Sequence, residues 1–218
     1  MGGYDGVMPQ VDAPRRVRAD AARSTARILA AAEAVLAEDP GAALERIADD
    51  AGLTRATVHR RFASRAALLE ALADQLDQRF LRAFREARVA TADPWIALNR
   101  LAELTFELKI GNRFAAQVMS GPSDRVLASL DLLLDRLRAA GVITEADPSW
   151  CRRVCLALLD EAHRLPVGSS ALDRPAGVLD EVPARSALFV RSLVGALGGS
   201  QTPTTRPLTT RSTDSPAG

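Results

Sequence analysis

Apolar residues along this chain recur every three to four positions, a spacing that predicts helices and not strands. The first periodic segment spans about residues 19–38, and its apolar stripe consists of Ile28, Leu29, Ala32, Val35 and Leu36. A second long segment, about 64–87, keeps the same spacing at Leu68, Leu69, Leu72, Leu76, Phe80 and Phe84. Because no stretch alternates apolar and polar residues as a strand does, we expect an all-α fold.

The remaining chain continues this pattern in shorter pieces. Further helices are expected at about 44–51, 54–62, 94–109, 112–120, 122–140, 147–165 and 183–198. Pro94, Pro122, Pro148 and Pro183 lie near expected helix starts, where a missing backbone N–H costs little. Residues 1–18 and 199–218 lack periodicity, and we expect a flexible basic arm and a disordered tail there.

The two short helices at about 44–51 and 54–62 flank a tight turn at Gly52-Leu53-Thr54. Glycine suits a left-handed helix end, and Thr54 suits the cap of the following helix. Apolar residues at 44, 47, 48, 53, 58 and 62 are spaced to pack the two helices at a steep angle. This pattern predicts a helix-turn-helix, whose second helix enters the major groove of DNA. Polar and basic side chains for that groove come from Thr54, Arg55, Thr57 and Arg60.

The stretch GLTRATVHRRFASRAALLEAL, with the preceding Ile47-Ala48 and Ala51-Gly52, resembles the signature of TetR-family regulators. The resemblance extends over about residues 22–72. It departs from the family pattern where His59 replaces a tyrosine, where Arg65 replaces a lysine, and where Ala42 and Ala43 leave the helix at 44 without a Ser or Thr cap.

The resemblance implies specific DNA contacts. Arg55 and Thr57 are the expected base-reading residues. The expected phosphate contacts are Thr54, His59, Arg60 and Arg65. Arg23 and Thr25, near the expected start of the first helix, are predicted to add phosphate contacts where a helix N-terminus attracts anions.

Charge is distributed unevenly, although the formal net charge is only +1. Between residues 15 and 27 there are five arginines and one acid, and between 54 and 65 there are four arginines and no acid. From residue 89 onward, fourteen basic residues balance fourteen acidic ones. A basic excess limited to the N-terminal third is typical of a nucleic-acid-binding module.

Composition narrows the classes of protein to which this chain could belong. Hydrophobic residues make up 47% and aromatics only 4%, which favours a helical core. There is no apolar run of the ~18 residues that a membrane span requires, and no signal-peptide core, so we expect a cytoplasmic protein without a membrane partner. Cys151 and Cys155 fit small core residues better than a metal or redox site.

The C-terminal part contains large adaptable side chains that are candidates for the wall of an effector pocket: Trp95, Phe106, Phe114, Met119 and Trp150. Plain core packing is the alternative for each of them. By family resemblance, the last two helices pair with their copies in a second subunit, and the candidate dimer-interface residues are Leu156, Leu159, Leu188, Phe189, Leu193 and Leu197. Burial within one subunit is the alternative there.

Together these features predict a helix-turn-helix DNA-binding domain at 19–65, followed by a helical effector-binding and dimerisation domain at 66–198. The predicted function is a homodimeric, sequence-specific transcriptional regulator, a repressor released from a palindromic operator by a small apolar or aromatic effector. A DNA-binding protein without an effector, and a helical scaffold or enzyme with a vestigial helix-turn-helix, remain alternatives. No nucleophile–base pair, metal spacing or phosphate loop is found, so no catalytic residues, metal or cofactor are expected.

Overall fold

The chain, seen in a computed structural model, is described over residues 13–118, 121–172 and 180–199. These ranges contain helices and turns and no β-strand, which confirms the expected all-α fold. The helices in the described ranges are α1 (Ala13–Glu38), α2 (Leu44–Asp50), α3 (Arg55–Arg61), α4 (Arg65–Glu86), α5 (Pro94–Gly111), α6 (Arg113–Val118), α7 (Asp124–Ala139), α8 (Pro148–Arg164) and α9 (Glu181–Ala196).

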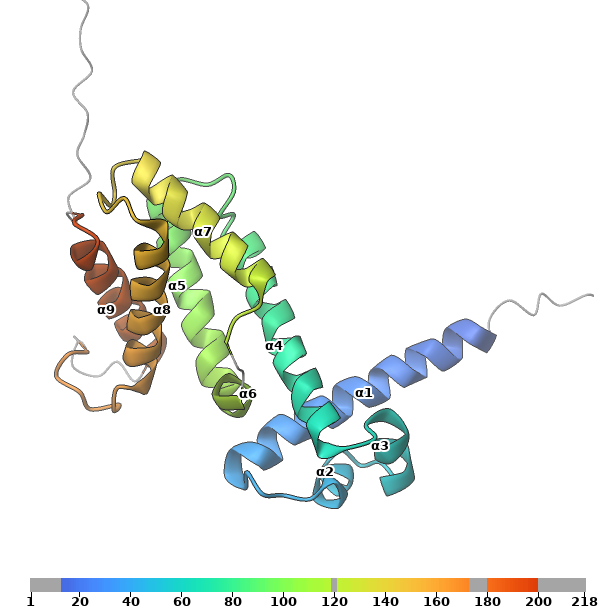
Figure 1. Cartoon of the computed structure of the whole chain (residues 1–218). Coiled ribbons are helices and arrows are strands. Elements are labelled where there is room, and N and C mark those ends of the chain that lie inside the picture. Colours follow the sequence, from blue (N-terminus) through green and yellow to red (C-terminus); the bar gives the residue numbers. More distant parts are fainter. Residues whose placement is uncertain (1–12, 119–120, 173–179, 200–218) are drawn as a thin grey trace, which may run out of the picture.

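The helices form two bodies joined by α4 (Figure 1). Helices α1, α2 and α3 lie together at one end, and α5, α7, α8 and α9 form a bundle at the other. Helix α4 runs from the first body into the second, and α6 lies near the point where the two meet (Figure 1). Helices α4 and α6 are therefore the elements that connect the bundle to the small body.

The first helix begins earlier than its apolar pattern indicates. We expected an unstructured arm through residue 18, but α1 starts at Ala13, so residues 13–18 are helical instead. Alanine and arginine are strong helix formers even where no apolar stripe is present. The rest of the expected arm, residues 1–12, lies outside the described residues, as does the expected tail from residue 200 onward.

The small body has its own core, built from helices α1 to α4 and part of α6. Its fully buried side chains are Ile28, Ala32, Leu36, Ile47, Ala48, Val58, Leu68 and Leu76. Ile47 on α2 and Val58 on α3 are both 0% exposed, as a helix-turn-helix requires of the residues between its helices. Phe114 and Ala115 of α6 also belong to this core, so α6 is packed into the small body.

The bundle has a separate and larger core, in which α9 packs against both α5 and α8. Phe106 of α5 meets Phe189 of α9 edge to face, with ring centroids 6.1 Å apart. Other fully buried members include Leu133, Leu134, Leu137, Ile143, Leu193 and Leu197.

Helix α4 contributes to both cores, so the expected domain boundary at residue 65 falls at the start of a shared element. Leu68, Leu72 and Leu76 pack in the small body, whereas Ala83 packs in the bundle. Between them, Asp77 accepts hydrogen bonds from the backbone N–H and the hydroxyl of Ser123, at 3.2 and 2.9 Å. This contact fastens the middle of α4 to the start of α7.

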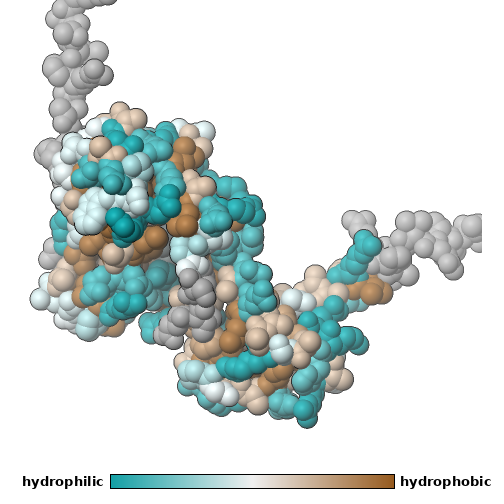
Figure 2. Space-filling view, viewed as in Figure 1, coloured by the Kyte–Doolittle hydropathy of each residue, from teal (hydrophilic) through white to brown (hydrophobic). Residues whose placement is uncertain are grey.

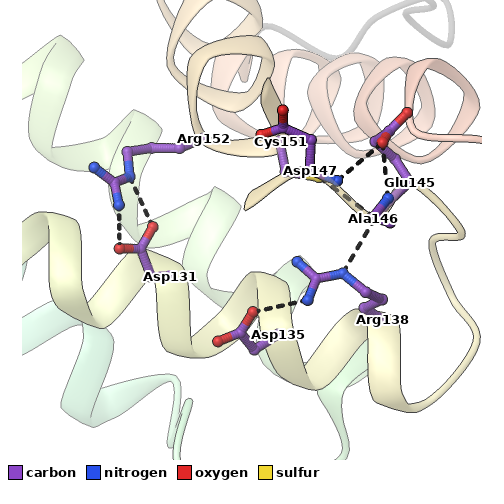
Figure 3. A network of polar contacts seen from close by, with 8 residues as sticks. All are labelled: Asp131, Asp135, Arg138, Glu145, Ala146, Asp147, Cys151 and Arg152. Carbon is purple, nitrogen blue, oxygen red and sulfur yellow. Dashed lines mark hydrogen bonds and ion pairs between the residues drawn. The ribbon is translucent and has the colours of Figure 1, made fainter. Parts of the chain in front are cut away.

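A polar network joins α7 to α8 and the turn before it (Figure 3). Arg152 donates to both oxygens of Asp131, at 2.8 and 2.5 Å, in the bidentate geometry that makes such pairs strong. Arg138 contacts Asp135 and also donates to the backbone carbonyl of Glu145, at 3.0 and 3.1 Å. The arrangement fixes the turn and therefore the start of α8.

Both cysteines are free thiols in the core of the bundle. Cys151 is 0% exposed and Cys155 is 4% exposed. Burial raises the pKa of Cys155 to about 12, so this thiol stays protonated at neutral pH. Such a thiol is a packing residue and a weak nucleophile. In the described ranges no helix is both long and apolar enough to cross a bilayer.

Candidate DNA-binding surface and ligand cavity

The turn between α2 and α3 depends on one glycine and one arginine. Gly52 has φ of +60°, a left-handed conformation that favours glycine. Arg27, on α1, donates to the carbonyls of Ala51 and Gly52 at 2.5 and 3.2 Å. A Cβ added at Gly52 would lie 2.9 Å from this guanidinium. The sequence pattern predicted the role of Gly52 but gave no signal for Arg27, which only the packing of α1 reveals.

The start of α3 is capped as predicted. The Thr54 hydroxyl accepts a hydrogen bond from the backbone N–H of Thr57 at 3.2 Å. The two threonine hydroxyls also lie 2.9 Å apart and share a hydrogen bond. In contrast, α2 has no side-chain cap at Ala43, again as expected from the sequence.

Helix α3 faces solvent with basic side chains and buries only Val58. Arg55 is 69% exposed, and its guanidinium lies 2.7 Å from a carboxylate oxygen of Glu45 on α2. His59 lies beside the same pair, 3.4 Å from Arg55 Nε and 4.0 Å from Glu45. Arg60 and Arg61 are exposed and form no ion pair with a described residue. Arg55, His59, Arg60 and Arg61 are thus accessible basic side chains of α3, whereas Thr57 is half-buried.

Arg65 has a different position from that expected of a phosphate contact. It is half-buried, donates to the carbonyl of Ala42 at 2.6 Å and also donates to the carbonyl of Pro40. These bonds hold the segment that leads into the uncapped α2. Its guanidinium is therefore engaged by the protein's own backbone.

Arg23 and Thr25 do not lie at a helix start, so the expectation of free N-terminal amides is wrong for them. They are ten and twelve residues beyond the first residue of α1, Ala13. Arg23 pairs with Asp20, and Thr25 donates to the carbonyl of Ala21 at 3.0 Å. Arg23 still lies one helical turn before Arg27, on the side of α1 that faces the helix-turn-helix turn.

The bundle contains a partly open cavity of about 1080 Å³ between α4, α5, α6, α7, α8 and α9. Most of its lining is apolar, including Phe80, Phe84, Leu98, Leu101, Leu130, Leu134, Leu156, Leu159, Phe189 and Leu193. Polar and charged side chains on the wall are Thr105, Lys109, Arg113, Asp160, His163, Arg164, Glu181 and Arg185. An apolar cavity with a few polar groups is the usual form of a small-molecule site.

The four expected pocket residues that the structure describes do not line this cavity. Phe106 is 0% exposed in the bundle core, and Phe114 packs in the core of the small body. Trp95 packs on the outside of the bundle core, and Trp150 is 47% exposed at the start of α8. Met119 lies outside the described residues. The bulkiest of these side chains fill the interior or remain on the surface, whereas leucines and other phenylalanines surround the empty volume.

Most of the expected dimer-interface residues also lie elsewhere. Phe189, Leu193 and Leu197 are at most 5% exposed within the single chain, so the expectation is wrong for these three. Leu156 and Leu159 line the cavity. The reason is that α9 packs on α5 and α8, so its most apolar stripe faces inward.

An outer apolar surface remains on α8 and α9, which we call the α8/α9 face: Trp150, Val154, Leu158 and Leu188. Trp150 is exposed, and the other three are half-buried. Figure 2 shows hydrophobic surface where these two helices lie in the bundle.

Helix α6 lies between the cavity and the small body. The carboxylate of Glu33, on α1, accepts hydrogen bonds from the backbone N–H groups of Phe114 and Ala115, at 2.9 and 3.2 Å. Burial raises the pKa of Glu33, and these two hydrogen bonds oppose that shift. Arg113 and Ala116 of the same helix line the cavity. The sequence gave no signal for this contact, since Glu33 is separated from α6 by about eighty residues of chain.

Lys109 is the only lysine of the chain and lies on the cavity wall with 14% of its side chain exposed. The sequence offered one signal for this residue, namely that arginine occupies every other Lys or Arg position. Among the described residues, no group of three or more His, Cys, Asp or Glu side chains is placed to hold a metal ion.

Comparison with known proteins supports the DNA-binding assignment of the small body. The family model described as "Bacterial regulatory proteins, tetR family" matches residues 28–72, which include α2, α3 and part of α1. The HTH-type transcriptional repressor LfrR of Mycolicibacterium smegmatis is 35% identical over 152 residues, covering 65% of this chain and 78% of LfrR.

Solved structures of other proteins are similar to this chain over most of its length, including both the small body and the bundle. The structure of LfrR from Mycobacterium smegmatis in complex with proflavine is similar with a TM-score of 0.52 at 26% identity, covering 80% of this chain and 94% of that one. The regulator PfmR from Thermus thermophilus shares the fold with a TM-score of 0.58 at 23% identity, covering 76% of this chain and 97% of that one. With its helix-turn-helix, its helical bundle and this similarity to LfrR, the chain belongs to the TetR family of DNA-binding transcriptional regulators.

Proposed function

We propose that the chain is a homodimeric repressor that leaves a palindromic operator when a small apolar molecule occupies the bundle cavity. The observation that carries the DNA-binding half is the exposure of α3, which buries only Val58 and turns Arg55, His59, Arg60 and Arg61 to solvent. Two copies of α3 in a dimer would enter successive major grooves roughly 34–36 Å apart or somewhat more. A protein that regulates transcription in a bacterium works in the cytoplasm, where we place it.

On α3 we assign base reading to Arg55 and Thr57, which lie in the first turn of the helix. Thr54, His59 and Arg60 are assigned to phosphates, with Arg23 of α1 as a further contact. We assign Arg65 to holding the segment before α2, because its guanidinium already donates to two backbone carbonyls.

The cavity supports the effector half of the proposal. A bundle with a filled interior would favour a DNA-binding protein without an effector, whereas this one contains about 1080 Å³ of largely apolar space. The relative LfrR is named a repressor, and its structure holds proflavine. A molecule in the cavity changes DNA affinity only by its differential affinity for two conformations, commonly about 1–3 kcal/mol of coupling.

Helix α6 is the proposed route between the two sites. One side of it lines the cavity, and its first backbone N–H groups are held by Glu33 of α1. Displacement of α6 by a ligand would break or shift the Glu33 contact and thereby tilt α1, which carries the helix-turn-helix turn through Arg27.

For dimerisation we propose the α8/α9 face, because it is the outer apolar surface of the helices that the family uses for pairing. Leu158→Glu on this face should convert a dimer to a monomer in sedimentation experiments. Leu132→Glu, on the 45% exposed Leu132 of α7, is the matched control and should leave the dimer intact. Equal sedimentation of both variants with the wild type would contradict this assignment.

The function is tested by selecting bound DNA from random oligonucleotides and then measuring Arg55→Ala on the selected operator. We expect a loss of about 1–3 kcal/mol in binding free energy and a relaxed preference at one base position. Arg82→Ala, at an exposed arginine of α4, is the control and should bind normally. Failure to select any sequence would contradict the function, and an equal loss on all sequences would limit Arg55 to a phosphate contact.

A further inference from the structure

The charged side chains of the cavity wall are unevenly paired. Both carboxylates on the wall already have cationic partners: Glu181 contacts Arg185 at 3.0 Å, and Asp160 contacts Arg164 at 2.6 Å. Asp160 also lies 3.7 Å from the ammonium of Lys109. No lining carboxylate in the described part of the chain is therefore free to receive a cationic ligand.

The cations of the same wall exceed the acids, with four basic side chains against two carboxylates. Lys109 of α5 shares Asp160 with Arg164 at the longer of the two distances, so its charge is the less completely balanced. Arg113, the first residue of α6, lines the cavity and forms no ion pair with a described residue. These two side chains give this part of the cavity a positive potential.

His163 lies on the same side of α8 as Asp160, one turn further along, and belongs to the cavity wall. Its Nδ1 is fully buried and has no hydrogen-bond partner in the described ranges. Burial lowers the pKa of His163 to about 4, and the neighbouring Lys109, Arg185 and Arg113 act in the same direction. The imidazole is therefore neutral at neutral pH, with one N–H to donate. Its charged neighbours are the three cations and the carboxylate of Asp160, which acts in the opposite direction.

An oxyanion suits this part of the wall, because it accepts hydrogen bonds from the ammonium of Lys109 and from an N–H of the neutral imidazole of His163, and both side chains line the cavity. The remaining space is lined by aliphatic side chains and by Phe80, Phe84 and Phe189, which suit a hydrocarbon body.

We propose that the cavity selects an apolar molecule carrying one oxyanion group, such as a carboxylate, with that group held between Lys109 and His163. The proposal rests on the effector role given to the cavity above and names the chemical class of the effector. It also predicts that this cavity disfavours cationic molecules, in contrast to LfrR, whose structure holds the cationic dye proflavine. A cation in this cavity would lie near Lys109 and Arg113, and no carboxylate among the described lining residues is unpaired.

The test uses three straight-chain ligands of ten carbons each that differ in their head groups: decanoate, decanol and decylammonium. Binding to the full-length protein is measured by isothermal titration calorimetry at neutral pH. We expect decanoate to bind at least about tenfold more tightly than decanol, since a charge-assisted hydrogen bond commonly contributes this much, and decylammonium to bind most weakly. Decylammonium binding as tightly as decanoate would overturn the proposal.

Variants locate the head group. Lys109→Met keeps the length and apolar stem of the side chain and leaves Asp160 paired with Arg164, so the fold is preserved. Lys109→Met should remove the preference for decanoate over decanol without changing the affinity for decanol. Lys109→Arg should keep that preference. The control Arg82→Met, at an exposed position of α4, should change the affinity for neither ligand. Equal weakening of decanoate and decanol by Lys109→Met would show a role in shape only and overturn the proposal.

The effector role and the oxyanion class fail differently. If all three ligands fail to bind while the protein still binds its operator, the effector role of the cavity is wrong and this inference falls with it. If decanol binds as tightly as decanoate, the cavity remains an effector site and only the oxyanion class is wrong.

Discussion

The two ends of the molecule use basic side chains in opposite ways. On α3, Arg60 and Arg61 are exposed and have no ion pair in the described structure, so their charge is available to a partner. In the bundle, Arg185 is 3% exposed and donates to Glu181 and to the carbonyls at 162, 163 and 165. The same residue type thus serves recognition where it is hydrated and architecture where it is buried. Exposure and hydrogen-bond partners, more than residue identity, separate the two roles.

The largest expected effect belongs to the buried arginine. Arg185→Ala removes the partner of Glu181 and of three backbone carbonyls, so it should lower the free energy of unfolding by about 3 kcal/mol. Urea denaturation followed by circular dichroism measures this change. Arg82→Ala on exposed α4 should stay within about 0.5 kcal/mol of the wild type. A small effect at Arg185 would remove the distinction between the two ends.

Arg65 is the intermediate case, an arginine of the small body that the structure uses for architecture. Arg65→Ala removes two hydrogen bonds to the carbonyls of Ala42 and Pro40, so we expect a loss of about 1–2 kcal/mol in unfolding free energy. The dependence of DNA affinity on salt concentration should keep its slope. A slope that falls by about one unit with unchanged stability would instead make Arg65 a phosphate contact.

Arg60 is expected to show the reverse behaviour. Arg60→Ala should leave the unfolding free energy within about 0.5 kcal/mol, because the side chain is exposed and unpaired in the described structure. The plot of log affinity against log salt should become shallower by about 0.9 unit, since one fewer phosphate is neutralised. Fluorescence anisotropy of labelled DNA over a series of salt concentrations measures this slope. An unchanged slope would show that Arg60 does not contact a DNA phosphate.

The smallest effect is expected at Glu45, the acid beside the basic face of α3. Its carboxylate lies 2.7 Å from Arg55 and repels DNA phosphates in the same region. Glu45→Gln should therefore strengthen DNA binding about two- to fivefold, the range of an exposed ion pair. Glu107→Gln, at an exposed acid of the bundle, controls for net charge and should change affinity less. Weaker binding by Glu45→Gln would show that Glu45 positions Arg55 for DNA.

The helix-turn-helix was predictable because its determinants are neighbours in the sequence. The glycine with positive φ, the threonine cap and the apolar positions of α2 and α3 all lie within about twenty residues, and local propensity agrees with packing there. The role of Arg65 was not predictable, because its partners precede it by more than twenty residues and are backbone carbonyls.

The cavity was not predictable for a related reason. Its wall comes from helices distributed over more than a hundred residues, and which face of each helix turns inward depends on how they pack. Choosing the largest side chains failed because Phe106 fills the core, where its ring meets Phe189. Choosing the most apolar positions of α9 as a dimer surface failed similarly, since Leu193 and Leu197 are buried within the bundle core of a single chain.

A single lysine in a chain otherwise rich in arginine has a practical consequence. Apart from the α-amino group, Lys109 is the one amine in this sequence that reductive methylation with isotope-enriched formaldehyde would modify. The resulting methyl groups would give one side-chain resonance, and that resonance would originate inside the bundle. Spectra recorded during titrations would then follow occupancy of the site directly, without engineering a label into the protein.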